Sequence, residues 1–326
     1  MTAGVLLLAA TLLLGAVGVF LIRSHKQNER DQWNFENMEE YLSQRQQLDT
    51  KRQQLEAEIL QVERAVKGTV MLLFDQCAPN AYEIVYAQLS EFEMTGSLVF
   101  RNVLPGDEGV ITLQQWQEME QNGWSAVLAT PTELMSDARG NAAYADMLKE
   151  YAERQRKAFA DLGLDQPAAY AFARGECTEH TLNALCEIGF TVFSAPDMPT
   201  KVINEECTVF QEAYLASGPE APLIQADVER IKNKADALVI KTRYVHVTED
   251  LSLDTDLTKF RMGMLNSLSG YRNGESILID SLDRGRTSYL AQRAADEEAD
   301  RQIGALQEQI QAIEAQLAAL WAQYRS

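Results

Sequence analysis

The chain has 326 residues, of which 46% are hydrophobic and 24% are charged, as in a globular protein of one large domain with accessory helices. Lysine and arginine number 29 against 48 aspartates and glutamates, so the formal net charge is -19. Nucleic-acid binding needs a basic surface that displaces counterions, and this acidity argues against it. An anionic polymer is an awkward ligand for the same reason, although a local basic patch would escape the average.

The first predicted element is an uncharged apolar stretch over residues 4–22, GVLLLAATLLLGAVGVFLI. It is just long enough to cross the hydrocarbon core of a bilayer as one helix, so residues 1–30 are assigned to a transmembrane anchor with a basic flank. A cleaved signal peptide is the alternative, but no convincing small-x-small cleavage site follows. Arg23, Lys26 and Arg30 come directly after the span, and the positive-inside rule therefore places the rest of the chain in the cytoplasm.

The second predicted element is a helical arm over residues 31–67. Apolar residues recur in it every seven positions, at Tyr41, Leu48, Leu55 and Val62. This heptad pattern favours a coiled-coil helix, although Arg45 and Arg52 interrupt its second seam.

The other end of the chain, residues 286–326, has a cleaner heptad pattern. One seam contains Ile303, Ile310, Leu317 and Tyr324, and the other contains Ala299, Leu306, Ile313 and Leu320. Two arms of similar length at opposite ends of one domain predict an antiparallel pair within the chain. That pair would return Trp321 and Tyr324 towards Trp33. A homodimer formed through the coiled coil is the alternative.

Between the arms, residues 68–285 alternate short apolar runs with amphipathic stretches. The runs predict strands at 69–74, 96–100, 125–129, 168–173, 191–194, 237–247 and 276–279. The stretches predict helices at 81–91, 113–121, 142–162, 178–188 and 257–268. Repeated strand–helix alternation favours a parallel barrel, with an open doubly wound sheet as the alternative. No GxGxxG or P-loop follows the first strand, which argues against a nucleotide site.

The first of these strands, VMLLF, is followed directly by Asp75, Gln76 and Cys77. In α/β domains, ligands bind at the carboxyl ends of the strands. A carboxylate, an amide and a thiol at such a position therefore mark this strand end as a candidate site.

Several segments, in this order, resemble the polysaccharide deacetylase (NodB homology) family. They are a strand ending in FDxx, a helix, the strand SLVF, the segment ITLQQWQEMEQNGW and, further on, AYAFARGECTEHTLNALCEIGF. The resemblance covers residues 69–133 and 168–190 and extends more weakly to about Ser281. It implies a deformed (β/α)7-type barrel, in which a divalent metal such as zinc, held by one Asp and two His, assists deacetylation of sugars.

This chain keeps little of the metal site that the resemblance implies. The family's TFDDG motif falls on residues 73–77, so Asp75 stands at the position of the base and Gln76 replaces the metal-binding Asp. The HxxxH pair of the family falls on Ala129 and Glu133. Because a stable divalent site normally takes about three protein ligands, we expect no metal and no other cofactor.

The later motifs are reduced as well. The family's Arg-x-Pro-x-Gly motif falls on Ala171, Ala173 and Gly175 and keeps only the glycine, whereas its late histidine motif matches His246. Asp75 and His246 are therefore the candidate catalytic residues that the resemblance implies. A capping role for the aspartate and a hydrogen-bonded core position for the histidine are the structural alternatives.

Candidate ligand-binding residues lie beside these motifs. Aromatic faces suit pyranose rings, and packing within the barrel is the alternative role for such residues. The candidates are Trp124, Tyr170, Phe172 and Gly175.

The four cysteines fit neither a disulfide-dense scaffold nor a zinc site, since no CxxC pair exists. In the fold that the resemblance implies, the loops with Cys77 and Cys177 border one mouth, which predicts a disulfide between them in place of the metal. Cys207 is an alternative partner for either. Cys186 shares a helix face with leucines, which favours a buried apolar role.

The sequence therefore predicts a membrane-anchored, deacetylase-like domain without catalysis, which binds a cell-envelope glycan or a protein partner. A divergent active carbohydrate deacetylase and a structural coiled-coil scaffold are the alternatives. The family that the sequence resembles usually works outside the cytoplasm, so the resemblance and the positive-inside rule disagree. We expect the domain to be extracytoplasmic, because the segment before the span is too short to decide the orientation.

Overall fold

The computed structural model describes the backbone of residues 2–134, 141–215, 221–242 and 266–325, and the side chains within 24–27, 37–134, 141–213, 225–241 and 266–324. The chain divides into two compact units. One contains residues Glu63–Asp300, and the other combines Met1–Val62 with Arg301–Ser326. The larger unit thus includes the predicted 68–285 segment and a short extension at each end.

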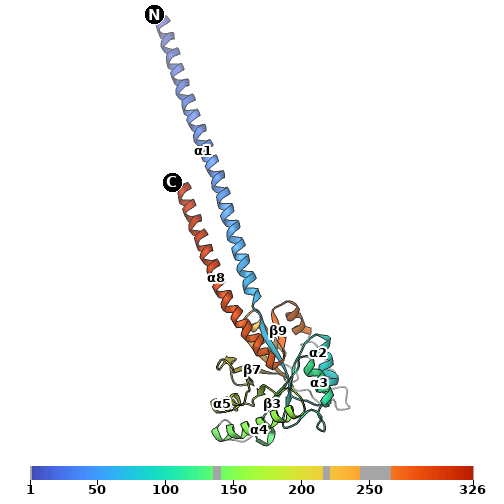
Figure 1. The fold of residues 1–326 in the computed structure, drawn as a ribbon. Helices are drawn as coiled ribbons and strands as arrows, with labels where there is room; N and C mark the ends of the chain where they lie inside the picture. The colour runs from blue at the N-terminus through green and yellow to red at the C-terminus, as the bar shows by residue number, and fades with distance from the viewer. Residues whose placement is uncertain (1, 135–140, 216–220, 243–265, 326) are drawn as a thin grey trace. The chain divides into compact units, whose positions relative to one another are not determined.

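The larger unit is a closed barrel of parallel strands (Figure 1). Seven strands form it, and β8 pairs again with β1, which excludes the open sheet. In order around the barrel, they are β1 (Gly68–Phe74), β2 (Ser97–Phe100), β3 (Ser125–Ala129), β4 (Ala169–Ala171), β5 (Val192–Ala195), β7 (Thr208–Leu215) and β8 (Ala237–Thr242). Between β1 and β2 the pairing is short and involves Leu73 with Ser97 and Phe74 with Leu98.

Two further strands extend the sheet. β9 (Ile277–Asp280) pairs in parallel with the first half of β1, and β6 (Lys201–Val202) pairs antiparallel with β7. The sequence pattern did not reveal β6 or β7. In β7 the polar pair Gln211 and Glu212 interrupts the apolar run, so its period was hidden. The predicted ends at 243–247 and most of the helix at 257–268 lie outside the described residues, and 266–273 is helical.

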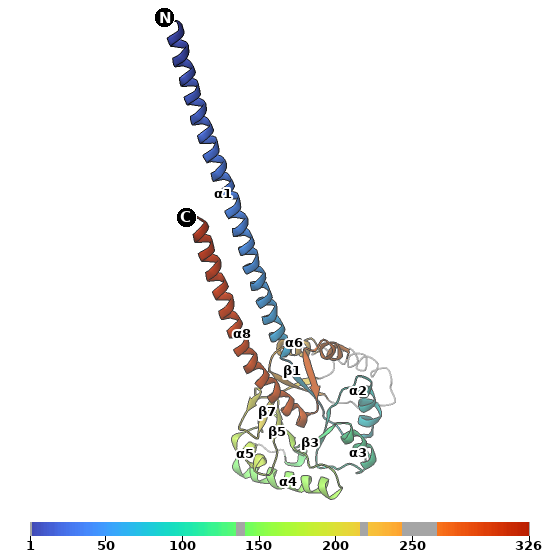
Figure 2. The same ribbon diagram turned by 45° about the horizontal axis from the view of Figure 1, so that its top comes forward.

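Helices surround the strands, as Figure 2 shows for α2, α3, α4 and α5. They are η1 (Ala81–Tyr86, a π-helical turn), α2 (Ala87–Glu91), α3 (Leu113–Gln121), η2 (Thr132–Leu134, a 3-10 turn), α4 (Ala142–Asp161), α5 (Glu179–Glu187) and α6 (Ala221–Ile231). Thr112 begins α3 and Thr178 begins α5 with reciprocal capping boxes. These caps satisfy amide groups that a helix start otherwise leaves unpaired, and they explain why both helices begin where the sequence predicts.

Side chains alternate between the lumen of the barrel and an outer shell under the helices. Met71, Leu73 and Val99 belong to the lumen cluster, whereas Leu72 and Leu98 belong to the shell that packs against the helices. This alternation is the period of two that any strand imposes. It decides which residues at the strand ends can meet inside the barrel.

The amino end of the lumen is closed by the start of α8 (Leu282–Arg325). The backbone N–H of Leu282 donates to Ser97 Oγ at 2.7 Å, and Ser97 Oγ lies 2.8 Å from Ser125 Oγ. Leu282 belongs to the lumen cluster, and Gly285 lies so close to Met71 that a Cβ there would overlap its Sδ and Cγ. The glycine therefore allows the helix to approach the barrel closely.

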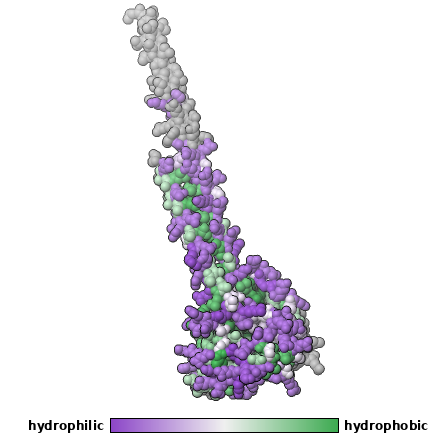
Figure 3. Space-filling model, viewed as in Figure 1, coloured by the Kyte–Doolittle hydropathy of each residue, from purple (hydrophilic) through white to green (hydrophobic). Residues whose placement is uncertain are grey.

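The smaller unit pairs the two arms within the chain. Leu55 of α1 (Thr2–Ala65) packs with Leu306 and Ile313, and the ring centroid of Tyr41 lies 5.9 Å from that of Trp321. Residue numbers rise along one helix as they fall along the other, so the pair is antiparallel. Figure 3 shows apolar side chains along the paired stretch. A coiled-coil homodimer is not tested by these contacts and stays a prediction.

The register of the arms differs from the expected one. Trp321 lies against Tyr41, and so does Tyr324, at 5.4 Å between ring centroids. At a rise of 1.5 Å per residue, Tyr41 is about 12 Å further along the helix than Trp33, beside which both were expected. The side chain of Trp33 itself lies outside the described residues.

Within the described part of the chain, no helix is both long and apolar enough to span a membrane. The side chains of residues 4–22 lie outside that part, so the anchor stays a prediction.

Two glycines of α8 provide a matched test of the packing that closes the amino end of the lumen. We expect Gly285→Ala to lower the free energy of unfolding by about 1–3 kcal/mol, because its Cβ overpacks against Met71. Gly304 has open space around it, so Gly304→Ala is expected to be neutral or to stabilise by up to about 1 kcal/mol. Urea unfolding of both variants measures this, and equal effects would contradict the packing of Gly285 against the lumen.

Candidate functional site

The carboxyl end of the barrel lumen carries two ion pairs on four neighbouring strands. Arg101 follows β2, Asp75 follows β1, Lys241 lies on β8 and Glu212 lies on β7. Each lies two residues beyond a lumen residue of its strand, namely Val99, Leu73, Val239 and Phe210. Since these strands adjoin in the order β2–β1–β8–β7, positive and negative side chains alternate around this part of the lumen.

The outer ion pair joins Asp75 to Arg101. Arg101 Nη1 lies 2.5 Å from Asp75 Oδ1 and also donates to the Asp75 carbonyl oxygen at 3.5 Å. The side chains are 18% and 29% exposed for the aspartate and the arginine. The aspartate at the expected base position is therefore held by a guanidinium group that the sequence analysis did not identify.

The inner ion pair is almost completely buried. Lys241 Nζ lies 3.2 Å from Glu212 Oε1 and 3.4 Å from its Oε2, which also accepts a 2.7 Å hydrogen bond from Ser194 Oγ. Breaking a buried ion pair leaves an uncompensated charge, so each partner requires the other. The sequence analysis missed both residues. Both could have been found as charged residues within a strand, at positions where the alternation of side chains points into the lumen.

The positions at which the sequence resemblance implies metal ligands do not fit a divalent ion. Gln76 is neutral and half-buried, Ala129 has no donor atom, and Glu133 is exposed in η2. Asp75 is already paired with Arg101. Among the described residues, no three His, Cys, Asp or Glu side chains gather closely enough to hold a metal. His246 lies outside the described residues, so its expected role is untested.

The expected sugar-stacking surface is wrong for all three aromatic residues. Trp124 is 4% exposed, with its ring centroid 5.8 Å from that of Phe74. Tyr170 and Phe172 are fully buried, and Phe172 stacks on Phe193 with centroids 5.6 Å apart. All three belong to the shell between strands and helices and not to the lumen, so they pack the barrel.

The loop after β4 contains a buried carboxylate. Glu176 accepts hydrogen bonds from the hydroxyl groups of Thr130 and Tyr144, and its Oε2 accepts one from the backbone N–H of Ala173 at 2.7 Å. Burial, and then the nearby charge of Glu176, raise the pKa of Tyr170, whose hydroxyl lies 2.6 Å from Thr130 Oγ1. These partners lie in the outer shell, so Glu176 stabilises the loop and does not face the lumen.

Gly175, the glycine kept from the family motif, immediately precedes this carboxylate. It has a φ of +74°, a left-handed conformation in which a side chain would be strained. Its N–H donates to Asp197 Oδ2 at 2.8 Å. It is exposed, but nothing in this geometry marks it as a ligand contact, and its role there is to shape the turn.

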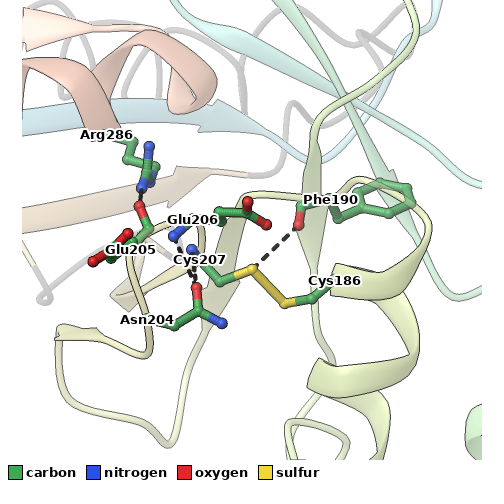
Figure 4. Close-up of a disulfide and its surroundings, with 7 residues drawn as sticks. All are labelled: Cys186, Phe190, Asn204, Glu205, Glu206, Cys207 and Arg286. Carbon is green, nitrogen blue, oxygen red and sulfur yellow. Dashed lines mark hydrogen bonds between the residues drawn. A yellow bond between two sulfur atoms is a disulfide. The ribbon is translucent and has the colours of Figure 1, made fainter.

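The structure has a disulfide between Cys186 and Cys207, and the predicted Cys77–Cys177 bond is wrong (Figure 4). Cys77 follows β1 and Cys177 follows β4, which are three strands apart, roughly 14 Å at the usual strand spacing. Cys186, at the end of α5, has its Cα 6.8 Å from that of Cys207, which precedes β7 beside β5. The apolar role expected for Cys186 is therefore also wrong.

The disulfide ties α5 to the turn between β6 and β7. Asn204 Oδ1 accepts hydrogen bonds from the backbone N–H groups of Glu206 and Cys207, at 2.9 and 2.7 Å. Figure 4 shows Arg286 of α8 donating to the carbonyl oxygen of Glu205 in the same turn. Three elements that are far apart in sequence are thus joined at this turn.

The fold and the site define a seven-stranded parallel barrel protein with an ion-paired lumen. No protein-family model matches the chain, and no curated protein matches it. Solved structures do match. They include the deacetylase PplD from Streptococcus pyogenes, a putative polysaccharide deacetylase from Mycobacterium smegmatis and a family 4 carbohydrate esterase from Bacillus anthracis.

The identities to these three are 19%, 13% and 14%, and the TM-scores are 0.38, 0.41 and 0.42. The alignments cover 55%, 67% and 72% of this chain and 85%, 94% and 92% of the others, in the same order. Polysaccharide deacetylases, which the sequence resembles, are thus among the matching structures. With TM-scores below 0.5, these likenesses carry no argument about the site, which rests on the chain's own residues.

Burial raises the pKa of Cys77 and that of Cys177 from 9.0 to about 12. At pH 8 the fraction of reactive thiolate in the folded chain should therefore be roughly a thousandfold below that of a thiol in the unfolded chain. We expect maleimide to label Cys77 and Cys177 only in denaturant, while non-reducing peptide mapping recovers Cys186 linked to Cys207. Rapid labelling of Cys77 without denaturant would contradict this.

The buried carboxylate can be tested by substituting two glutamates that lie three residues apart, one in the loop and one at the start of α5. We expect Glu176→Gln to lower the free energy of unfolding by about 2 kcal/mol, because an amide nitrogen replaces an acceptor of charge-assisted hydrogen bonds. Glu179 is exposed in the first turn of α5, so Glu179→Gln is expected to cost no more than about 1 kcal/mol. Chemical denaturation of both variants gives the comparison. Equal losses would contradict the stabilising role of Glu176.

Proposed function

We propose that this chain is a deacetylase-like barrel that acts as a binding module for a cell-envelope glycan or a protein, without metal-assisted deacetylation. The observation that supports this most directly is the Asp75–Arg101 ion pair. A general base must reach the proton that it accepts directly or through one water. Asp75 Oδ1 faces the guanidinium group of Arg101 and is shut off from solvent.

The surroundings of this pair support the same proposal. Metal-assisted hydrolysis requires an ion that polarises the carbonyl group and activates a water molecule. Gln76, Ala129 and Glu133 do not make a donor set for such an ion. A barrel mouth with fixed polar side chains remains suited to binding, because preorganised hydrogen-bonding groups lose little entropy when a ligand arrives.

We further propose that the module is anchored to a membrane by residues 4–22 and lies outside the cytoplasm. The Cys186–Cys207 bond supports this location, since disulfides persist in oxidising compartments and are rare in the cytosol. This argument outweighs the three basic residues after the span. The paired helical arms would then serve as a stalk.

Metal content and acetate release together test this proposal. After incubation of the purified full-length chain with zinc or cobalt and removal of free ions, we expect well under one bound ion per chain. We also expect no acetate release from acetylated chitooligosaccharide, because no complete ligand set is present. A family 4 carbohydrate esterase assayed in parallel controls for the substrate. Stoichiometric metal together with acetate release would overturn the proposal.

The binding role requires a positive result of its own. The full-length chain should sediment with purified cell-envelope material, and reduction of Cys186–Cys207 should leave this unchanged if the barrel stays folded. A chain that never sediments with any envelope fraction, glycan or protein, would leave a structural scaffold as the better reading.

A further inference from the structure

The Asp75–Arg101 pair has unused hydrogen-bonding capacity. Both contacts of the guanidinium group involve Nη1, while an arginine carries further donors on Nε and Nη2. Within the described residues, no group accepts from Nε or Nη2, and no group donates to Asp75 Oδ2. The inner pair differs, since Lys241 contacts both oxygens of Glu212, one of which also binds Ser194.

The position of Arg101 is fixed by its neighbours. Asn102 has a φ of +56°, and its N–H donates to the hydroxyl of Tyr151 at 2.9 Å. The same hydroxyl donates to the carbonyl oxygen of Ala129 at 3.1 Å, so one buried tyrosine links the ends of β2 and β3. Gln155 adds a 3.3 Å hydrogen bond to Asn102 Oδ1. Because these bonds fix the backbone next to Arg101, its side chain loses little conformational entropy when a ligand binds.

Spare donors beside a spare acceptor match a ligand that offers an acceptor and a donor together. One residue of an extended peptide does so, because its own carbonyl oxygen and N–H point to the same side, with the carbonyl oxygen for Arg101 and the N–H for Asp75. A purely anionic ligand would be repelled by Asp75, within a chain of net charge -19. A pyranose ring usually needs an aromatic platform, whereas Trp124, Tyr170 and Phe172 are buried in the shell. The chemistry therefore favours a peptide over a sugar.

We infer that Arg101 and Asp75 form a two-point hydrogen-bonding site for the backbone N–H and carbonyl groups of one residue in an extended peptide, so that the partner of the barrel is a protein. This inference rests on the proposed binding function and selects its partner class. Arg101 donates through Nε or Nη2 to the peptide carbonyl oxygen, while Asp75 Oδ2 accepts from the peptide N–H. The contact between Arg101 Nη1 and Asp75 Oδ1 fixes the two side chains relative to each other.

Arg101→Lys is the decisive variant, because a lysine keeps the charge opposite Asp75 but lacks the second donor edge. The probe is N-acetyl-trialanine N-methylamide, titrated into the full-length chain and followed by saturation-transfer NMR. We expect about a tenfold loss of affinity, the factor for one lost hydrogen bond to a charged group, with an unchanged melting temperature. Asp75→Asn should lose affinity as well. Lys149→Gln, which removes the Lys149–Glu187 pair on the surface, is the control and should bind normally.

Each other outcome has a defined meaning. Unchanged peptide affinity in Arg101→Lys overturns the site. If a tetramer of N-acetylglucosamine binds in place of the peptide and depends on Arg101, the peptide assignment is wrong while the binding function stands. If neither probe binds and no envelope fraction is retained, both proposals fail.

A measurement on the unmodified chain covers the case in which a variant does not fold. With saturating peptide, amide hydrogen exchange should slow in residues 100–103 and not in the surface segment around Lys149. Protection confined to the arms, or absent from residues 100–103, would also overturn the site.

Discussion

The alternation of side chains along the strands of a closed barrel is the constraint on which this structure depends. Because β8 pairs with β1 and β1 with β2, every strand has one face towards the lumen and one towards the helices. Hydrophobic residues occupy both faces, so the strands read as nearly continuous apolar runs. At the carboxyl end the same alternation brings Asp75, Arg101, Lys241 and Glu212 together in one lumen.

In that lumen, each of these acidic side chains is paired with a basic one. Arg101 compensates Asp75, and Lys241 compensates Glu212, with Ser194 completing the inner cluster. The inner pair, Lys241 and Glu212, is buried and both carboxylate oxygens are in contact with the lysine. The outer pair is partly exposed, and Nε and Nη2 of Arg101 and Oδ2 of Asp75 have no partner among the described residues. The ion pair nearer the mouth is therefore the one with hydrogen-bonding groups still available. This difference between the two pairs supports the proposed binding role at the mouth.

The barrel explains why the expected sugar-stacking surface and the expected Cys77–Cys177 disulfide are both wrong. Trp124, Tyr170 and Phe172 stand at positions that face the helices, so their aromatic surface is used to pack the barrel. The disulfide forms between α5 and the turn before β7 because β5 brings these elements together, whereas β2 and β3 separate the loops of Cys77 and Cys177. The face on which a side chain stands and the order of the strands are both properties of the folded barrel, and a linear motif contains neither.

Local sequence determined the elements that depend on neighbouring residues. The apolar runs placed β1, β3 and β8, the amphipathic stretches placed the two helices that Thr112 and Thr178 cap, and the heptads indicated that the arms would pair. It also singled out Asp75 at the end of the first strand, because a carboxylate directly after an apolar run is visible from residue type. β7 was not predicted because the charged Glu212 interrupts its apolar pattern. The partner that makes this charge tolerable, Lys241, lies on another strand.

Only the tertiary structure could decide which distant residues meet. The pairing of Asp75 with Arg101, of Cys186 with Cys207 and of Tyr41 with Trp321 joins segments through barrel closure, strand order and helix register. Each of these depends on the free energy of the whole fold, since one residue of slip turns a side chain from the lumen to the shell. The sequence by itself determined the strand–helix alternation of the barrel and the residue types at its site. The folded chain decided which of those residues are paired, because opposite charges are buried stably only where the fold brings them together.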